Sequence, residues 1–405
     1  MKRITTMALG LLSVMGANAQ TLDSYIQEAE NNNPEVQAFE IKYNIAKEKI
    51  SETNGLPNTE VSAGVFVSEP ETRTGAQKAR FSIKQMLPWF GTITARENYA
   101  SSLAEVDYLD IAITKRKLRL SVSQTYYALF AIKEKQKVLD ENIQLLKTYE
   151  RLALTSVEVG KASAVDVLRL QIRQNELEEN KLVLEQEYET ESTNFNKLLN
   201  REDSIAIELV DSLTIYEPTE IQQSRLKVHP ELEKYDKLYE SIAQSEILNQ
   251  KEAQPNLGFG LDYIPVADRA GINFSDNGKD ILMPMVSLSI PIFNNKYKSK
   301  TVQNEMRQNE INAQKEHRKN LLETILNKAF NSREAARIKY ATQLKNLHRS
   351  NDAEKILIKN YETGTIDFND VLDIQELQLK FQMNVIEAIK NYYIQMSIVN
   401  YVTNQ

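Results

Sequence analysis

Two stretches of the sequence are too long and too uninterrupted to fold inside one compact domain. Residues 92–157 and 295–360 have helical character, and neither stretch contains a proline. At 1.5 Å per residue a helix of this size would extend about 100 Å, well beyond the diameter of a small domain. Glycine and proline are also scarce, with 12 and 10 in 405 residues. We therefore expect a few very long helices rather than many short elements.

The two stretches belong to an internal duplication. A Glu-x-Gly-x5-Asp-Val-Leu segment at 158–168 recurs at 362–372, and three further landmarks recur in the same order about 200 residues apart. These landmarks are Asn33-Pro34-Glu35 with His229-Pro230-Glu231, Leu56-Pro57-Asn58 with Gln254-Pro255-Asn256, and the segments ending in Phe90 and Phe293. We expect two tandem structural repeats, at residues 20–215 and 216–405, joined near 201–227. Each would hold a helix, a β-hairpin, a long helix and a further helix.

Each repeat changes its hydrophobic period from that of a helix to that of a strand. Residues 22–54 have a helical pattern, and an alternating pattern follows over about 59–87. The second repeat alternates in the same way over about 257–292. Its return strand is the clearest, with Val286, Leu288, Ile290 and Ile292 alternating with Ser287 and Ser289. Pro88 and Pro291 follow the two hairpins and mark the passage from strand to helix.

The N-terminus predicts export from the cytoplasm. Met1-Lys2-Arg3, an apolar run over 7–15 and Ala17-Asn18-Ala19 have the order of a secretory signal peptide, which we assign to residues 1–19. The chain contains no cysteine, which excludes disulfides, thiolate metal sites and a lipid-modified cysteine. The net charge of −7 is spread along helical stretches, so a nucleic-acid partner is not expected.

Membrane entry, if it occurs, would require strands. No segment after the signal is apolar enough to cross a membrane as a helix, and 26% of the residues are charged. Strands in lipid must close into a barrel, and bacterial barrels begin at about eight strands. Four strands per chain therefore need two or three chains. A small soluble sheet above an ordinary antiparallel coiled coil remains the alternative at this stage.

The residues of the duplication also carry a family resemblance. The sequence resembles the outer membrane efflux protein family typified by TolC over essentially the whole mature chain. The resemblance rests on the duplicated hairpin-and-helix unit, on Pro88 and Pro291, and on the Gly-x5-Asp-Val motif in both repeats. It implies a mainly α fold with a small β part. Three chains would form a twelve-stranded outer-membrane barrel, and their long coiled-coil helices would continue it as a periplasmic tube.

The resemblance also implies a function and partners. The chain would be the outer-membrane channel of a tripartite efflux or type I secretion system. Its partners would be two further copies of itself, a periplasmic adaptor (membrane fusion) protein, an inner-membrane transporter and outer-membrane lipid, with no cofactor. A periplasmic coiled-coil adaptor, or a structural protein without a membrane barrel, is the alternative function, although it leaves the amphipathic strands without a role.

The two glycine motifs are the candidate functional turns. Gly160 and Gly364 can take the left-handed conformation that ends a helix, and Asp166 and Asp370 follow in the first turn of the next helix. Helix capping alone would explain this pattern. The resemblance implies more: adaptor-docking turns that include Gly160, Asp166, Gly364 and Thr365, and a periplasmic gate ringed by Asp370 and Asp373. Ile366 stands where family members can carry a basic gating residue.

Catalysis is not expected. The three histidines, His229, His317 and His348, lie far apart without metal-ligand spacing. The sequence also lacks a nucleophile motif and a glycine-rich phosphate loop.

Overall fold

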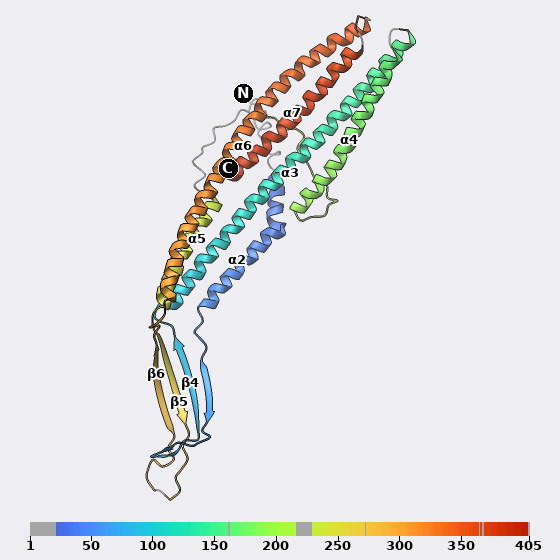
Figure 1. The fold of residues 1–405 in the computed structure, drawn as a ribbon. Helices are drawn as coiled ribbons and strands as arrows, with labels where there is room; N and C mark the ends of the chain where they lie inside the picture. Colours follow the sequence, from blue (N-terminus) through green and yellow to red (C-terminus); the bar gives the residue numbers. More distant parts are fainter. Residues whose placement is uncertain are drawn as a thin grey trace, which may run out of the picture. The chain divides into compact units, whose positions relative to one another are not determined.

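The computed structural model describes residues 22–160, 163–215, 229–271, 273–363, 365–366 and 368–403. The predicted signal peptide at residues 1–19 lies outside these ranges, as do Gly364 and much of the predicted junction at 201–227. The named elements are α2 (Pro34–Thr53), β1 (Glu60–Val65), β2 (Glu71–Thr72), β3 (Gly75–Ala76), β4 (Ala79–Leu87), α3 (Thr92–Glu158), α4 (Ala164–Leu198), α5 (Pro230–Glu252), β5 (Asn256–Ile264), β6 (Ile281–Ser289), α6 (Lys296–Glu362) and α7 (Phe368–Thr403) (Figure 1).

The long helices agree with the sequence pattern. α3 and α6 each contain 67 residues, and their ends lie within two residues of those predicted. They are followed by α4 and α7, with 35 and 36 residues. Both halves of the chain thus run through a helix, paired strands, a long helix and a shorter helix. We keep the two tandem repeats, at residues 20–215 and 216–405, as a proposal that this order supports.

The chain packs as two compact units that cut across the proposed repeats. One, which we call the helical unit, contains the residues up to Ala38 together with Ile111–Pro230 and Arg318–Gln405. The other, the strand unit, contains Phe39–Asp110 and Glu231–His317. The boundaries between them fall inside α2, α3 and α6 and at the start of α5. Each unit therefore takes segments from both halves of the chain.

The helical unit has two apolar clusters. One joins α3, α4, α6 and α7 around buried residues such as Leu146, Leu170 and Phe368. The other joins residues 22–32 to α3 and to the end of α4 around Tyr126 and Phe195. Every methylene removed from water contributes roughly 0.8 kcal/mol, so these clusters supply much of the free energy that holds the helices together.

Polar contacts spaced seven residues apart on α3 fix the positions of the neighbouring helices along it. On one face of α3, Lys135 pairs with Glu387 of α7 at 2.9 Å. One heptad later, Asn142 accepts a hydrogen bond of 2.8 Å from Gln375 of α7. One further heptad on, the Tyr149 hydroxyl donates to Glu354 of α6. Because buried polar groups are costly when unpaired, a shift of α7 along α3 would be penalised.

The predicted helix over 22–54 is interrupted at Asn33. Residues 22–32 are helical, Asn33 is not, and α2 begins at Pro34. Proline is favoured at a first helical position because it has no backbone N–H to leave unpaired. The Asn33 side chain accepts a hydrogen bond of 2.9 Å from the backbone N–H of Glu35, which caps the new helix.

The strand unit contains one antiparallel sheet in the order β1-β4-β5-β6. Its central pairing joins β4 to β5, so the two predicted hairpins lie side by side (Figure 1). β6 ends at Ser289, and the prediction that Ile290 and Ile292 continue this strand is therefore wrong. The chain turns there instead, with a hydrogen bond of 3.0 Å from the Ile292 N–H to the Ile290 carbonyl.

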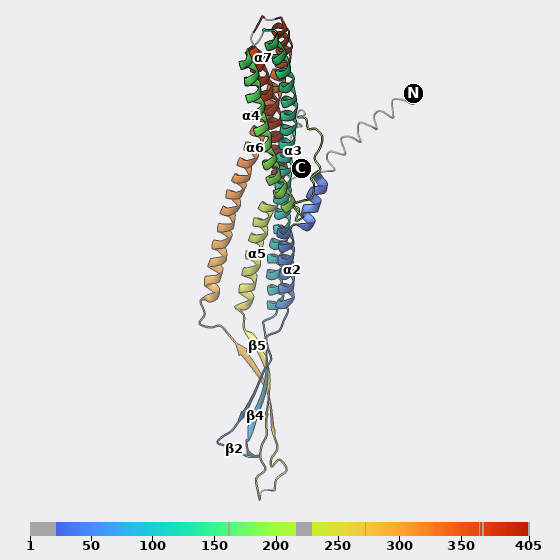
Figure 2. The same ribbon diagram turned by 90° about the vertical axis from the view of Figure 1, so that its right-hand side faces the viewer.

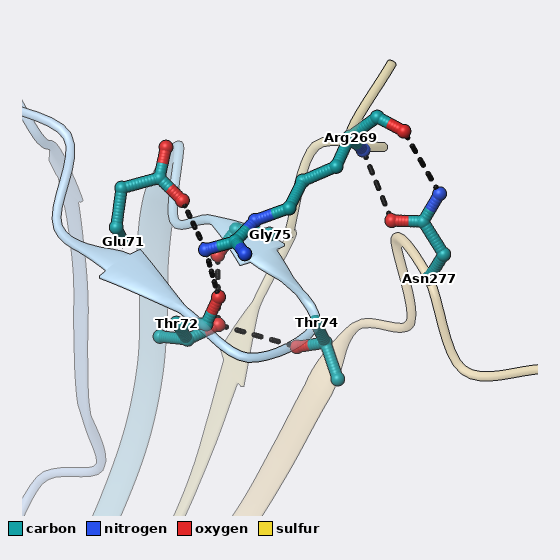
Figure 3. A network of polar contacts seen from close by, with 6 residues as sticks. All are labelled: Glu71, Thr72, Thr74, Gly75, Arg269 and Asn277. Carbon is teal, nitrogen blue, oxygen red and sulfur yellow. Dashed lines mark hydrogen bonds and ion pairs between the residues drawn. The ribbon is translucent and has the colours of Figure 1, made fainter. Parts of the chain in front are cut away.

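The loops of the two hairpins form a small folded structure of their own. The sequence pattern missed the short ribbon of β2 and β3, whose strands contain two residues each. Figure 3 shows Arg269 of the β5–β6 loop donating hydrogen bonds to the Glu71 carboxylate at 2.6 Å and to the Thr72 carbonyl at 2.5 Å. The Asn277 side chain braces Arg269 by bonding both its N–H and its carbonyl. Another ion pair joins Arg73 to Asp276 and lowers the pKa of this aspartate.

The close approach of the two hairpin loops requires glycine at position 75. Gly75 has a φ of +135°, and a Cβ there would overlap the Ala267 carbonyl of the other loop. We predict that Gly75→Ala destabilises the ribbon by about 1–3 kcal/mol. Trypsin should then cleave at Arg73 roughly tenfold faster or more, since the open form is more populated. Gly64→Ala is the control because an added Cβ there meets no atom within 4 Å. Equal cleavage rates in the two variants would contradict the tight docking of the loops.

Candidate functional site

One face of the sheet is apolar and uncovered. The strand register places large apolar side chains of all four strands in cross-strand rows, and most of them are exposed; Val286, for example, retains 74% of its accessible surface. This outer face contains Val61, Val65, Phe81, Ile83, Phe259, Leu261, Tyr263, Leu282, Val286 and Leu288. A contiguous exposed apolar face of this kind marks a surface that contacts lipid or another protein.

The opposite face consists mostly of small and polar residues, with several methionines among them. The same register sets Gly64 opposite Arg80 and Ser82 opposite Asp262. Arg80 forms an ion pair with the buried Asp262 carboxylate. On this inner face Gly258 and Gly260 leave room for Met86 and Met285. The assignment of Ser287 to one face and Leu288 to the other agrees with the alternation in the sequence.

Short connections join this sheet to the long helices. Pro88 directly follows β4, and Gly91, with a φ of +80°, precedes α3. Pro291 lies between β6 and α6. The side chain of Asn294 accepts a hydrogen bond of 2.9 Å from the N–H of Lys296, which caps α6. Both prolines therefore stand where the backbone leaves the sheet and has no ladder hydrogen bond to donate.

The first glycine turn joins α3 to α4. Gly160 has a φ of +71°, the left-handed conformation expected at the end of a helix. Ser163 and Asp166 form a capping box in which each side chain accepts a hydrogen bond of 3.2 Å from the backbone of the α4 N-terminus. Val165 and Leu168 of this turn and α4 are exposed.

The second turn joins α6 to α7. The Thr365 N–H and hydroxyl both donate to the Asn360 carbonyl, at 3.0 and 2.8 Å, and thereby end α6. Phe368 anchors the start of α7 in the core, where its ring lies 4.8 Å from that of Tyr361. Asp370, in the first turn of α7, and Asp373, one turn later, are exposed.

The structure places Asp373, but not Asp370, beside basic residues of the other half. Asp373 lines a groove between α4 and α7 together with Arg169 and Arg173. Arg169 donates a hydrogen bond to Asn369, and Arg173 lies 3.9 Å from Glu376. The sequence pattern alone does not single out these two arginines. Superposition of the two glycine motifs would have found Arg169, which occupies the position equivalent to Asp373.

No described helix is long and apolar enough to cross a membrane.

Comparisons with known proteins agree on the fold. Residues 25–201 match the family model named Outer membrane efflux protein. The outer-membrane channel OprN shares 15% sequence identity, covers 95% of this chain and 90% of its own, and superposes with a TM-score of 0.77. VceC, an outer membrane protein of Vibrio cholerae, shares 14% identity over 95% and 96% of the two chains with a TM-score of 0.74. The open state of the Neisseria gonorrhoeae MtrE outer membrane channel shares 14% sequence identity with this chain. The match covers 95% of this chain and 88% of MtrE, with a TM-score of 0.74.

A search of the curated proteins found no match. The family match covers the first hairpin, α3 and α4, and the solved channels share the fold along nearly the whole chain. The mainly α fold with a small antiparallel sheet is as expected from the sequence. Residues 25–201 therefore resemble the outer membrane efflux proteins, and the chain as a whole shares the fold of the solved outer-membrane channels.

Proposed function

We propose that the chain is the outer-membrane channel of a tripartite efflux or type I secretion system. The observation that carries this proposal is the sheet, which has an exposed apolar face on one side and a mostly small or polar face on the other. Membrane β-barrels have these two faces, toward lipid and toward the water-filled lumen. A soluble adaptor would leave the apolar face uncovered. Members of the family are channels and not enzymes, in keeping with the sequence.

The open edges of the sheet favour a trimer. β1 and β6 are each paired on one side only. Such edges are not tolerated in hydrocarbon, so several chains must share one closed barrel. Two chains would give the minimal eight strands and three would give twelve. The channels that share this fold support the wider barrel, and the helices would then form a tube in the periplasm.

The two turns are the proposed contact with a periplasmic adaptor protein. Gly160, Asp166, Gly364 and Thr365 belong to these turns. The exposed apolar residues next to Gly160 support a role in protein contact. The adaptor would connect the channel to an inner-membrane transporter, and the transporter would select the cargo. Asp370 and Asp373 are the proposed gate, since three-fold symmetry would arrange each of them as a ring of carboxylates.

The first prediction of the proposed function concerns oligomeric state. The purified protein should be a trimer that survives mild detergent, because each chain needs neighbours on both sheet edges. Mass measurement of the protein–detergent complex would show this. A monodisperse monomer that keeps its strand signal would contradict the shared barrel.

The second prediction concerns the two faces of β6. Val286→Arg should destabilise the assembled channel by about 2–4 kcal/mol, because residue 286 lies near the middle of β6 on the apolar face. Ser287→Arg, its neighbour on the polar face, should assemble like the wild type. Yields of heat-resistant trimer from membranes would compare the two variants. Equal yields would show that the faces are wrongly assigned.

The third prediction concerns the gate. Rings of Asp370 and Asp373 should favour cations and bind a trivalent cation as a plug. Asp370→Ala combined with Asp373→Ala should therefore reduce both cation preference and block in planar bilayers.

Asp166→Ala is the matched control for the gate, because Asp166 caps α4 at the equivalent position of the first turn. Its loss should cost about 1 kcal/mol of helix stability and leave ion selectivity unchanged. If the double variant keeps its selectivity and its block, the two aspartates serve only as helix caps.

A further inference from the structure

The connections between the sheet and the long helices expose large apolar side chains. We call this surface the collar and define it by Trp89, Phe90, Ile290, Ile292, Phe293, Lys296, Lys298 and Lys300. Phe90 retains 77% of its accessible surface, and Phe293 is fully exposed. Ile290 and Ile292 are exposed as well, although they lie beyond the end of β6. Exposed apolar side chains therefore follow the last strand residues up to the start of α6, and Figure 2 shows the connection that leads from the sheet to this helix.

The collar also concentrates positive charge. Lys296, Lys298 and Lys300 occupy the first two turns of α6, and no acidic residue occurs in the sequence from 281 to 304. Among the described residues, no carboxylate forms an ion pair with any of these three lysines. Lys296 lies 5.6 Å from the ring of Tyr297. Lysines at a helix N-terminus oppose the helix dipole, so helix stability does not account for them.

The other connection shows that this charge is not required to start a long helix. The positions of α3 that correspond to Lys296, Lys298 and Lys300 are Ile93, Ala95 and Glu97. The one basic residue there, Arg96, pairs with Glu252 at 3.2 Å. The unpaired lysines are thus a feature of one connection only.

We propose that the collar binds the headgroups of anionic phospholipids at the periplasmic surface of the outer membrane. This inference rests on the proposed membrane barrel, whose lipid-facing surface ends at the collar. Aromatic side chains gather at the boundary between hydrocarbon and water, where Trp89, Phe90 and Phe293 would lie. Lysine side chains at the same depth reach phosphate groups while their methylene stems remain in the apolar layer. Each lysine near a charged surface adds attraction for anionic lipid.

The protein contains a built-in probe of this surface. Trp89 is its only tryptophan, and its ring lies 5.8 Å from that of Phe90. Full-length protein would be reconstituted in phosphatidylcholine vesicles that contain a minority of either brominated phosphatidylglycerol or brominated phosphatidylcholine. Bromine quenches tryptophan fluorescence at short range. We expect severalfold stronger quenching by the brominated phosphatidylglycerol, and we expect high salt to weaken this preference.

The variants separate a specific site from general charge. The test variant combines Lys296→Gln, Lys298→Gln and Lys300→Gln. In this variant the two brominated lipids should quench Trp89 fluorescence equally. The control combines Lys328→Gln and Lys345→Gln, two exposed lysines far along the same helix. It should keep the wild-type preference. Trimer yield of each variant would confirm that the proteins are assembled.

Each outcome decides a separate claim. If no brominated lipid quenches wild-type Trp89, the membrane barrel itself is wrong, and this inference falls with it. If both lipids quench the wild type equally, the barrel stands and the anionic-lipid site is wrong; the collar would then contact ordinary lipid or a neighbouring chain. A preference that survives in the triple variant, or disappears in the control, would also overturn the assignment to these lysines.

Discussion

The unpaired edges of one four-stranded sheet are the constraint on which the rest of the structure depends. β1 pairs only with β4, and β6 only with β5. In water these edges could bond to solvent, but the outer face beside them is apolar and exposed. In lipid the apolar face contacts hydrocarbon favourably, but the backbone N–H and C=O groups of the two edges have no hydrogen-bond partner. Further copies of the chain meet both requirements, because they can extend the sheet until it closes: the edges are then paired, and the apolar face can remain in lipid. The proposed channel and its symmetry depend on this requirement, and so do the proposed rings of Asp370 and Asp373.

The helices of the two units are held together by different kinds of contact. In the strand unit, Lys42 and Lys234 both pair with Asp110 and thereby join α2, α3 and α5. There, hydrogen bonds from Asn304 and neighbouring amide and hydroxyl groups lower the pKa of Glu246, although burial opposes the shift. In the helical unit, apolar clusters provide the adhesion, and the heptad contacts of α3 fix where α6 and α7 lie. The helix that carries the proposed gate is thus positioned by packing and buried amides rather than by its exposed aspartates.

Periodicity and duplication predicted most of the fold, and tertiary contacts decided what they missed. α3 and α6 can be recognised in the sequence because each is a very long run without proline. β5 and β6 can be recognised because each has nine residues, enough to show an alternating pattern. The ribbon of β2 and β3 is too short to show a period, and it forms because Arg269 and Asp276 of a distant loop bind it. In the sequence, Arg169 and Arg173 resemble the other charged residues of their helix. Only the fold brings them beside Asp373, which lies about 200 residues away.

The absence of cysteine from the natural sequence makes one measurement especially direct. Single cysteines placed one at a time along β1, from Glu60 to Val65, can be tested in membranes for reaction with a hydrophilic maleimide, because every residue of this strand is exposed in the single chain. A membrane barrel predicts a period of two: cysteines at Glu60, Ser62 and Gly64 react, whereas those at Val61, Ala63 and Val65 are protected by lipid. Uniform reactivity along the strand would mean that both faces meet water, and it would contradict the membrane barrel.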